Sequence, residues 1–120
     1  MKIIIILIIS LSANTIALAQ EFTLVTTIES VVPGGLGRSR MITTNSDGKM
    51  QETSMENFFS LVGINFQNIR DNDQSITDKI TAMTKDGWVL VNTTGGVYSG
   101  EKATGIFITR YLFRRDSASK

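Results

Sequence analysis

The residue types that carry out most catalytic chemistry are absent from this chain or scattered along it. The 120 residues include no histidine and no cysteine. A Ser-His-Asp or Cys-His catalytic group, a disulfide bond, and a zinc site with nitrogen or sulfur ligands are therefore excluded. Glu29, Glu52 and Glu56 do not form a recognisable pair of glycosidase acids. Carboxylate or phosphoryl-transfer chemistry remains formally open, but the composition favours a domain that is not an enzyme and needs no cofactor.

The strongest candidate for a binding site is a segment rich in glycine and arginine, Pro33-Gly34-Gly35-Leu36-Gly37-Arg38-Ser39-Arg40. Three glycines let backbone N–H groups converge, and two arginines that alternate on an extended chain point the same way. The segment could thus bind a carboxylate or phosphate through Gly34, Gly35, Gly37, Arg38 and Arg40. The alternative is a flexible loop with solvated arginines, which a glycine-rich pattern alone indicates more often.

A second glycine-rich stretch, Gly95 to Lys102, comes close to the phosphate-binding pattern G-x-x-x-x-G-K-[ST]. That pattern works when the lysine directly follows the glycine and a helix begins there. Here Glu101 separates the two, and a strand is expected to follow. The stretch is therefore predicted to be a hairpin loop.

The acidic residues from Asp71 to Asp78 invite comparison with a calcium-binding loop. An EF-hand requires glycine at its sixth position and glutamate at its twelfth, where this chain has Ile76 and Ala82. Helix capping and favourable charge in a first helical turn explain these acids without a metal. No metal site is expected.

The first nineteen residues have the pattern of a secretory signal peptide. Lys2 precedes an apolar run that begins at Ile3, and Ala17-Leu18-Ala19 forms a small-residue cleavage site. Ser10 and later polar residues interrupt the run well before the roughly 20 apolar residues that a membrane-spanning helix needs. The sequence predicts a signal peptide over residues 1–19, export to the periplasm or the extracellular space, and no membrane association after cleavage.

The charge balance argues against a nucleic-acid partner. The chain has 12 basic and 11 acidic residues, and loss of Lys2 with the signal peptide leaves 11 of each. A zero balance lacks the basic surface that binds phosphate backbones. The remaining length, about 100 residues, suits one hydrophobic core. We expect a single domain over residues 20–115 and a disordered polar tail over residues 116–120.

The first half of this domain is predicted to be mostly strand. Residues 22–32 alternate imperfectly and place Phe22, Leu24, Thr26 and Ile28 on one face. Residues 41–44 and 49–53 are expected to form a hairpin around the Asp-Gly turn signal. Residues 57–62 are predicted to be one or two helical turns ended by Gly63, and residues 65–73 a loop.

The second half contains the main helix and two strands. The helix is expected to begin at Asp73 or Ser75, because either can cap it, and to present Ile76, Ile80 and Met83 as one apolar stripe. Gly87 suits the left-handed position that ends a helix. Strands are predicted over residues 88–91 and 105–114, joined by a mobile glycine-rich turn. Trp88, the only tryptophan, is expected at the centre of the core.

This order of elements predicts an α+β fold. One main helix packs on one face of a small, mostly antiparallel sheet, with an inserted hairpin and short helix. The two strands after the helix should pair with each other, and the first strand should join them at the centre or edge.

The helix end Lys85-Asp86-Gly87-Trp88-Val89-Leu90-Val91 and the final strand, which closes with Arg114-Arg115, resemble a family of short bacterial domains of unknown function. That family ends a helix with Gly-Trp-Glu-Leu-Val and finishes on a basic strand. The resemblance covers about half of the exported chain. Val89 replaces the usual glutamate, and residues 33–73 form an insertion. The resemblance implies a fold but no activity.

The strands are apolar on both faces, although one helix can cover only one of them. The second face must be covered either by residues 58–66 or by another protein. We therefore expect an exported, non-catalytic domain that binds a protein partner or a second copy of itself. The alternative is a small-ligand or anion-binding domain that uses the Gly34–Arg40 segment.

Overall fold

The computed structural model describes residues 19–35, 37–100 and 104–117. Nearly all of the expected signal peptide therefore lies outside the described residues, as do Leu36, residues 101–103 and residues 118–120. The elements are β1 (Gln20–Val31), the short helix η1 (Pro33–Gly35), β2 (Ser39–Asn45), β3 (Met50–Met55), β4 (Phe59–Ser60), β5 (Gly63–Ile64), α1 (Phe66–Lys85), β6 (Val89–Ser99) and β7 (Gly105–Asp116).

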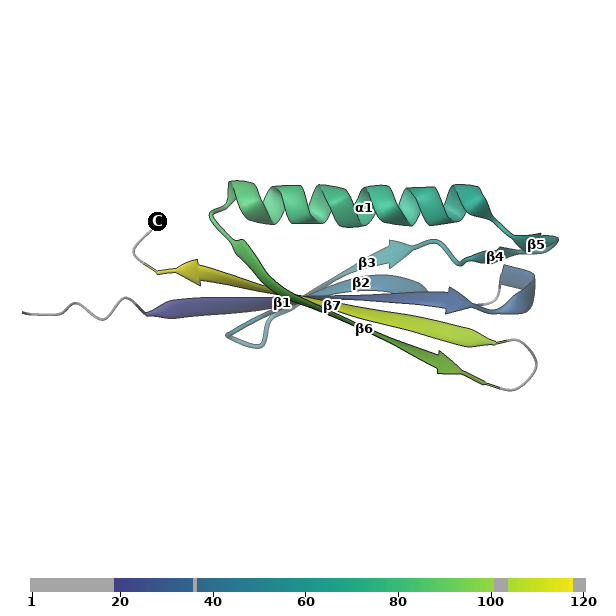
Figure 1. Ribbon diagram of the computed structural model, residues 1–120, viewed down its shortest axis with the longest axis horizontal. Helices are drawn as coiled ribbons and strands as arrows, with labels where there is room; N and C mark the ends of the chain where they lie inside the picture. Colours follow the sequence, from purple (N-terminus) through teal and green to yellow (C-terminus); the bar gives the residue numbers. More distant parts are fainter. Residues whose placement is uncertain (1–18, 36, 101–103, 118–120) are drawn as a thin grey trace, which may run out of the picture.

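The architecture is α+β, as the sequence predicts. Five antiparallel strands form one sheet in the order β3-β2-β1-β7-β6, and β4 and β5 form a separate two-stranded sheet. Figure 1 shows α1 lying along one face of the five-stranded sheet, with β4 and β5 beside its first turns. The first strand of the chain is therefore the centre of the sheet.

Two of the sequence predictions for the strands are confirmed. The β2–β3 hairpin closes on Gly48, which has a φ of 80° that suits glycine, and its N–H donates to the Asn45 carbonyl. The side chains of Phe22, Leu24, Thr26 and Ile28 share one face of β1, the face turned away from the helix. We call this side of the sheet the outer face and the other the helix face.

The helix begins earlier than predicted, at Phe66 rather than after Asp73. Asn65 is the N-cap, and its side-chain oxygen accepts from the backbone N–H groups of Gln67 and Asn68. Ser75 does not cap the helix, because its hydroxyl bonds to the Asp71 carbonyl one turn earlier. The expected loop over residues 65–73 is thus helical.

The end of the helix is as predicted. Gly87 has a φ of 85° and donates to the Thr84 carbonyl, while the N–H of Trp88 donates to the Met83 carbonyl. These two bonds form the Schellman arrangement that ends a helix on glycine. The chain turns at this point and enters β6.

The short helix predicted over residues 57–62 is wrong. Phe59–Ser60 and Gly63–Ile64 form a small hairpin instead. Gly63, the first residue of β5, adopts a φ of 128°, and the Phe58 N–H donates to the Ser30 carbonyl. Pairing with the end of β1 supplies backbone hydrogen bonds that an isolated helical turn of this length would lack.

Both final strands are longer than predicted. Gly95 and Gly96 belong to β6 rather than to a mobile turn, and β7 continues through Asp116. The Ser117 N–H donates to the Ala19 carbonyl, so the expected disordered tail does not include Asp116 or Ser117. The register of β7 against β1 runs from Gln20↔Asp116 to Val31↔Gly105.

The hydrophobic core is small and lies between the helix and the middle of the sheet. Its buried members are Val25, Met41, Met83 and Phe113. The predicted stripe is confirmed, because Ile76 and Ile80 pack against this cluster beside Met83. Within the described residues no helix is long and apolar enough to cross a membrane.

A buried asparagine links the first half of α1 by hydrogen bonds to the strands beneath it. Asn72 is 1% exposed, and its amide nitrogen donates to the Glu29 carboxylate (3.0 Å) and the Glu56 carbonyl (2.8 Å). Its amide oxygen accepts from the Glu56 N–H at 2.8 Å. One side chain thus satisfies both backbone groups of the residue that follows β3, and it ties α1 to β1.

Replacing Asn72 tests how much these hydrogen bonds contribute to stability. We expect Asn72→Ala to lower the free energy of unfolding by about 1–3 kcal/mol, because the Glu56 backbone groups lose their partners. Urea denaturation measures the change. Gln74→Ala, an exposed substitution on the same helix, is the matched control and should stay within about 0.5 kcal/mol of the parent. Equal effects of the two substitutions would contradict the role of Asn72.

Candidate functional site

Residues 58–66, which the sequence predicts as a cover for the second apolar face, do not cover the outer face of the sheet. The ring of Phe58 lies 5.6 Å from that of Phe107, which is paired with Glu29 and so belongs to the helix face. Residues 58–66 therefore extend the helix side, and the expectation that they cover the second apolar face is wrong. Leu24, Ile42 and Leu112 stay half-buried on an outer face that no other described segment lines.

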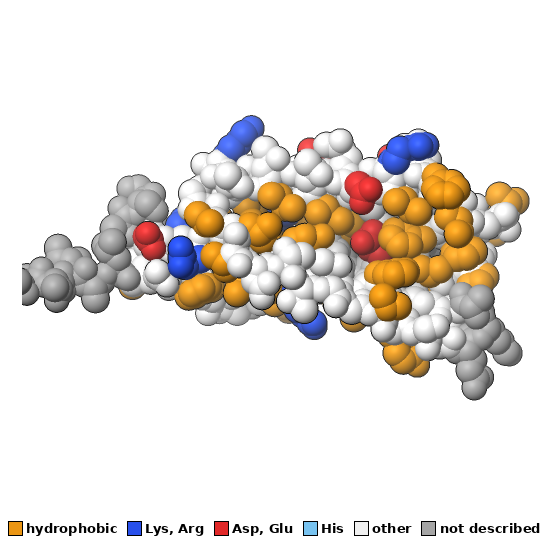
Figure 2. All heavy atoms as spheres, viewed as in Figure 1, with side chains coloured by type: hydrophobic (Ala, Val, Ile, Leu, Met, Phe, Trp, Pro, Cys, Tyr) orange, Lys and Arg blue, Asp and Glu red, His pale blue; other side chains and the backbone are white. Residues whose placement is uncertain are grey.

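Large apolar side chains gather at the end of the molecule where β4, β5 and the first turn of α1 lie. Figure 2 shows them as one hydrophobic area. Val62 is 97% exposed and Leu61 is 89% exposed at the tip of the small hairpin. We define the end patch by its exposed members Leu61, Val62, Ile64, Phe66, Val97 and Phe107. Soluble monomers rarely expose such a contiguous group, so it indicates an interaction surface.

The end patch borders a free strand edge. β6 pairs only with β7, and all eleven of its residues are exposed. Its sequence contains no charged residue and no proline, the features that usually protect an edge from pairing with another chain. At the opposite edge, β3 carries Glu52, which forms an ion pair with Arg40. The unprotected edge is thus the one beside the end patch.

An apolar hollow of about 200 Å³ lies where the edge and the end patch meet. Val97 and Phe107 are paired across β6 and β7 at this point. The residues lining the hollow are Val31, Val97, Ser99, Thr104, Gly105 and Phe107. It could accept an apolar side chain from a strand added beside β6.

The structure separates the two arginines of the predicted anion site. Arg40 lies in β2, and its guanidinium is bound to the Glu52 carboxylate on β3. Arg38 is exposed before the strand begins. Gly34 and Gly35 are in η1, where Gly34 has a φ of 78°. Gly37 runs so close to Ser30 that a Cβ at this position would clash with the serine side chain.

The backbone conformation of Gly34 and the close approach of Gly37 to Ser30 explain why glycine stands at these two positions. One of the two arginines, Arg40, is already paired with a carboxylate. Leu36, within the segment, lies outside the described residues. Anion binding by Gly34, Gly35, Gly37, Arg38 and Arg40 stays a prediction. No group of three carboxylates in the described ranges could hold a metal ion.

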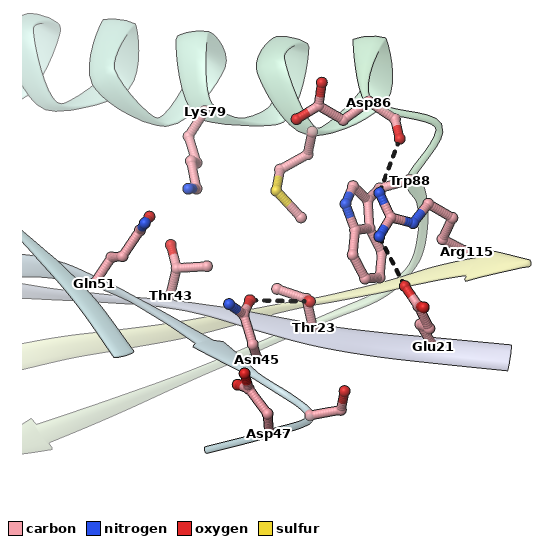
Figure 3. Close-up of a pocket in the computed structure, with 12 residues that line it drawn as sticks. Glu21, Thr23, Thr43, Asn45, Asp47, Gln51, Lys79, Asp86, Trp88 and Arg115 are labelled. Carbon is pink, nitrogen blue, oxygen red and sulfur yellow. Dashed lines mark hydrogen bonds and ion pairs between the residues drawn. The ribbon is translucent and has the colours of Figure 1, made fainter. Parts of the chain in front are cut away.

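A polar cavity of about 410 Å³ opens between the last turns of α1 and the sheet. Figure 3 shows side chains from the helix and four strands around it, with Lys79 extending from the helix toward Thr43 and Gln51. The cavity is lined by Glu21, Thr23, Thr43, Asn45, Ser46, Asp47, Gln51, Lys79, Met83, Asp86, Trp88 and Arg115. Sequence reasoning did not identify it.

Trp88 forms one wall of this cavity. The Arg115 guanidinium lies 4.2 Å from the centre of the indole and forms a 2.7 Å ion pair with Glu21, while it also donates to the Asp86 carbonyl. Figure 3 shows the indole between Arg115 and the open space. Trp88 is only partly buried and packs at the border of the core. The prediction that it forms the centre of the core is wrong; Phe113, with 0% exposure, holds that position.

Burial raises the pKa of the Glu29 carboxyl, which lies under α1 beside Asn72. The nearby negative charge of Asp73 also raises this pKa, and the hydrogen bond from Asn72 lowers it. Burial likewise raises the pKa of the Tyr111 hydroxyl, with a further contribution from Glu29. These groups lie between the end patch and the cavity and line neither.

No protein-family model, curated protein or solved structure significantly matches this chain. The resemblance to short bacterial domains of unknown function therefore stays a prediction.

Glu29 provides a test of the electrostatics under the helix. Its raised folded-state pKa means that the folded protein holds this proton more tightly than the unfolded chain, whose carboxyl titrates near 4.5. Its contribution to stability is therefore present at low pH and is lost as pH rises above this value. Glu29→Gln removes the titration, so its stability relative to the parent should increase between pH 4 and pH 8. Urea denaturation at both pH values measures the difference; an equal difference at both would contradict the assignment.

Proposed function

We propose that this protein is a non-catalytic binding domain whose partner is an extended segment of another protein. The partner adds a strand to the free edge of β6 and places apolar side chains on the end patch. The observation that carries the proposal is the coincidence of an uncharged edge strand, every residue of which is exposed, with a cluster of exposed apolar side chains.

The chemistry of strand addition fits this surface. An edge strand leaves backbone N–H and C=O groups that a second strand can pair with, and pockets for alternate side chains supply specificity. The hollow between Val97 and Phe107 is such a pocket. Gly95 and Gly96, which precede Val97, add no side chain to either face of the sheet beside this pocket. The apolar contacts with Leu61 and Val62 would then add affinity outside the strand pairing.

The same edge could receive β6 of a second copy, which would join two sheets into one. Such a contact is isologous, because the same patch serves both subunits. Oligomeric state separates the two cases: a monomer that binds peptides supports the heterologous partner, whereas a dimer dissociated by a charge on β6 identifies the second copy as the occupant.

A charge placed on the edge tests the proposal directly. We expect random peptides displayed on phage to yield binders with alternating apolar residues, and Val97→Lys to weaken their binding at least tenfold. The charge would have to be buried beneath the added strand. Fluorescence polarisation of a selected peptide measures the affinity, and circular dichroism checks the fold.

The matched control is Met50→Lys at the opposite sheet edge, where the methionine is 69% exposed, compared with 64% for Val97. Met50→Lys should leave peptide affinity unchanged. Failure to select any peptide, or equal loss from both substitutions, would reject β6 as the binding edge.

Export to the periplasm or the extracellular space is a second part of the proposal. Its basis is the signal-peptide pattern of residues 1–19. β1 begins at Gln20, so cleavage after Ala19 would leave every residue of the central strand in place.

N-terminal sequencing of the exported protein tests this part. The first residue should be Gln20 or lie within one or two positions of it, because Ala17 and Ala19 form the cleavage site. Protein recovered with Met1 intact and embedded in the membrane would contradict export by cleavage.

A further inference from the structure

The polar cavity lies beneath the end of α1, between the helix and the sheet, where packed apolar side chains are expected. Strand residues that face a covering helix are normally apolar, because the helix shields them from water. Here the helix-face residues Thr23, Thr43 and Asn45 are polar. The outer face beside them carries Phe22 and Leu24. Departures of this kind concentrate at functional sites.

The hydrogen bonds of the cavity leave most of its polar groups available. Thr23 donates to the Asn45 side-chain oxygen over a long 3.4 Å. Arg115 and Glu21 are committed to each other at 2.7 Å, and Asp47 bonds to the Lys49 backbone N–H. Within the described ranges Lys79 has no ion-pair partner, although its side chain is half-buried and extends into the space. An ammonium that has no counter-ion and extends into a cavity favours a ligand that carries a negative charge.

The other residues that line the cavity indicate the chemistry of the uncharged part of the ligand. One face of the Trp88 indole is covered by Arg115, and the indole borders the cavity, which Met83 also lines. An aromatic face packs against the C–H side of a sugar ring, while hydroxyl and amide groups pair with its hydroxyls. The carboxylates of Glu21, Asp47 and Asp86, which also line the cavity, oppose a highly charged ligand such as a nucleotide. The volume of about 410 Å³ is within the range of small-molecule sites.

We propose that this cavity binds an acidic monosaccharide unit. The Lys79 ammonium holds the carboxylate, and Thr43, Asn45 and Gln51 bond the ring hydroxyls. Trp88 contacts the apolar side of the ring. The site is at the opposite end of α1 from the end patch and does not depend on the function proposed for β6.

The only tryptophan of the chain lies in the site, so its intrinsic fluorescence reports binding without a label. We expect glucuronate to change the Trp88 emission of the full-length protein in a saturable way, with a Kd of about 1 mM for a ligand of this size. Glucose lacks the carboxylate and acetate lacks the ring, so each should bind at least ten times more weakly. Isothermal titration calorimetry checks the three affinities independently.

Lys79→Gln should weaken glucuronate binding about tenfold and remove the discrimination against glucose. Lys85→Gln, at an exposed lysine on the last turn of the same helix and outside the cavity, should leave both unchanged. Circular dichroism and urea denaturation confirm that both variants are folded.

Three outcomes would overturn the proposal. These are the absence of saturable glucuronate binding, equal affinity for glucose or acetate, and glucuronate binding that Lys79→Gln does not weaken. Val97→Lys should leave glucuronate affinity at the parent value, so failure of the strand-addition proposal and failure of this one are distinguishable.

Discussion

The pairing of β1 with β7 along their whole length is the constraint on which the rest of the structure depends. It joins the first and last strands at the centre of the sheet and fixes which side chains face the helix. Phe113 is placed opposite Thr23 and beside Val25, where α1 buries it completely. Because register sets the face of every residue on a strand, a shift by one residue would move Phe113 to the outer face and eliminate the core.

A sheet of five strands is wider than one helix can cover. The buried cluster draws on β1, β2 and β7, and the edge strand β6 has no buried residue. The core therefore occupies only the middle of the helix face. At one end this face continues into the exposed aromatic and aliphatic side chains around Phe107, and at the other it becomes the polar cavity under Lys79.

Sequence patterns were sufficient for elements with a strong local signal. β-branched residues marked the strands, Asp47-Gly48 marked the hairpin turn, and Gly87 marked the end of the helix. The helix start was missed because most residues between Asn65 and the stripe are polar, although Ile69 lies seven residues before Ile76 on the same helical face. The β4–β5 hairpin was missed because a cluster of apolar residues does not distinguish helix from strand, and its hydrogen bond to Ser30 is non-local.

The candidate sites differ in how far the sequence could reveal them. An uncovered apolar surface follows from strands that are apolar on both faces, but the end patch lies on the helix side, and its position requires knowledge of where Phe58 packs. The cavity had a weaker signal: Thr43 and Asn45 share the parity of the buried Met41 on β2. Only the sheet register brings them together with Thr23, and only the packing of α1 on this face brings Lys79 above them. Polar residues far apart in the chain become one site through tertiary pairing alone.

The arrangement also bears on whether the two sites influence each other. A ligand changes a distant site only if it binds two conformations of the protein with different affinities. The end patch rests on the β4–β5 hairpin, the first turn of α1 and one end of the β6–β7 pair, whereas the cavity rests on β1, β2, β3, the end of α1 and the other end of β7. Asn72 fixes the helix between them through bonds to Glu29 and Glu56, and Gly87 and Trp88 fix its end. Because the helix is held at both places, we expect each of the two surfaces to bind its ligand without changing the affinity of the other.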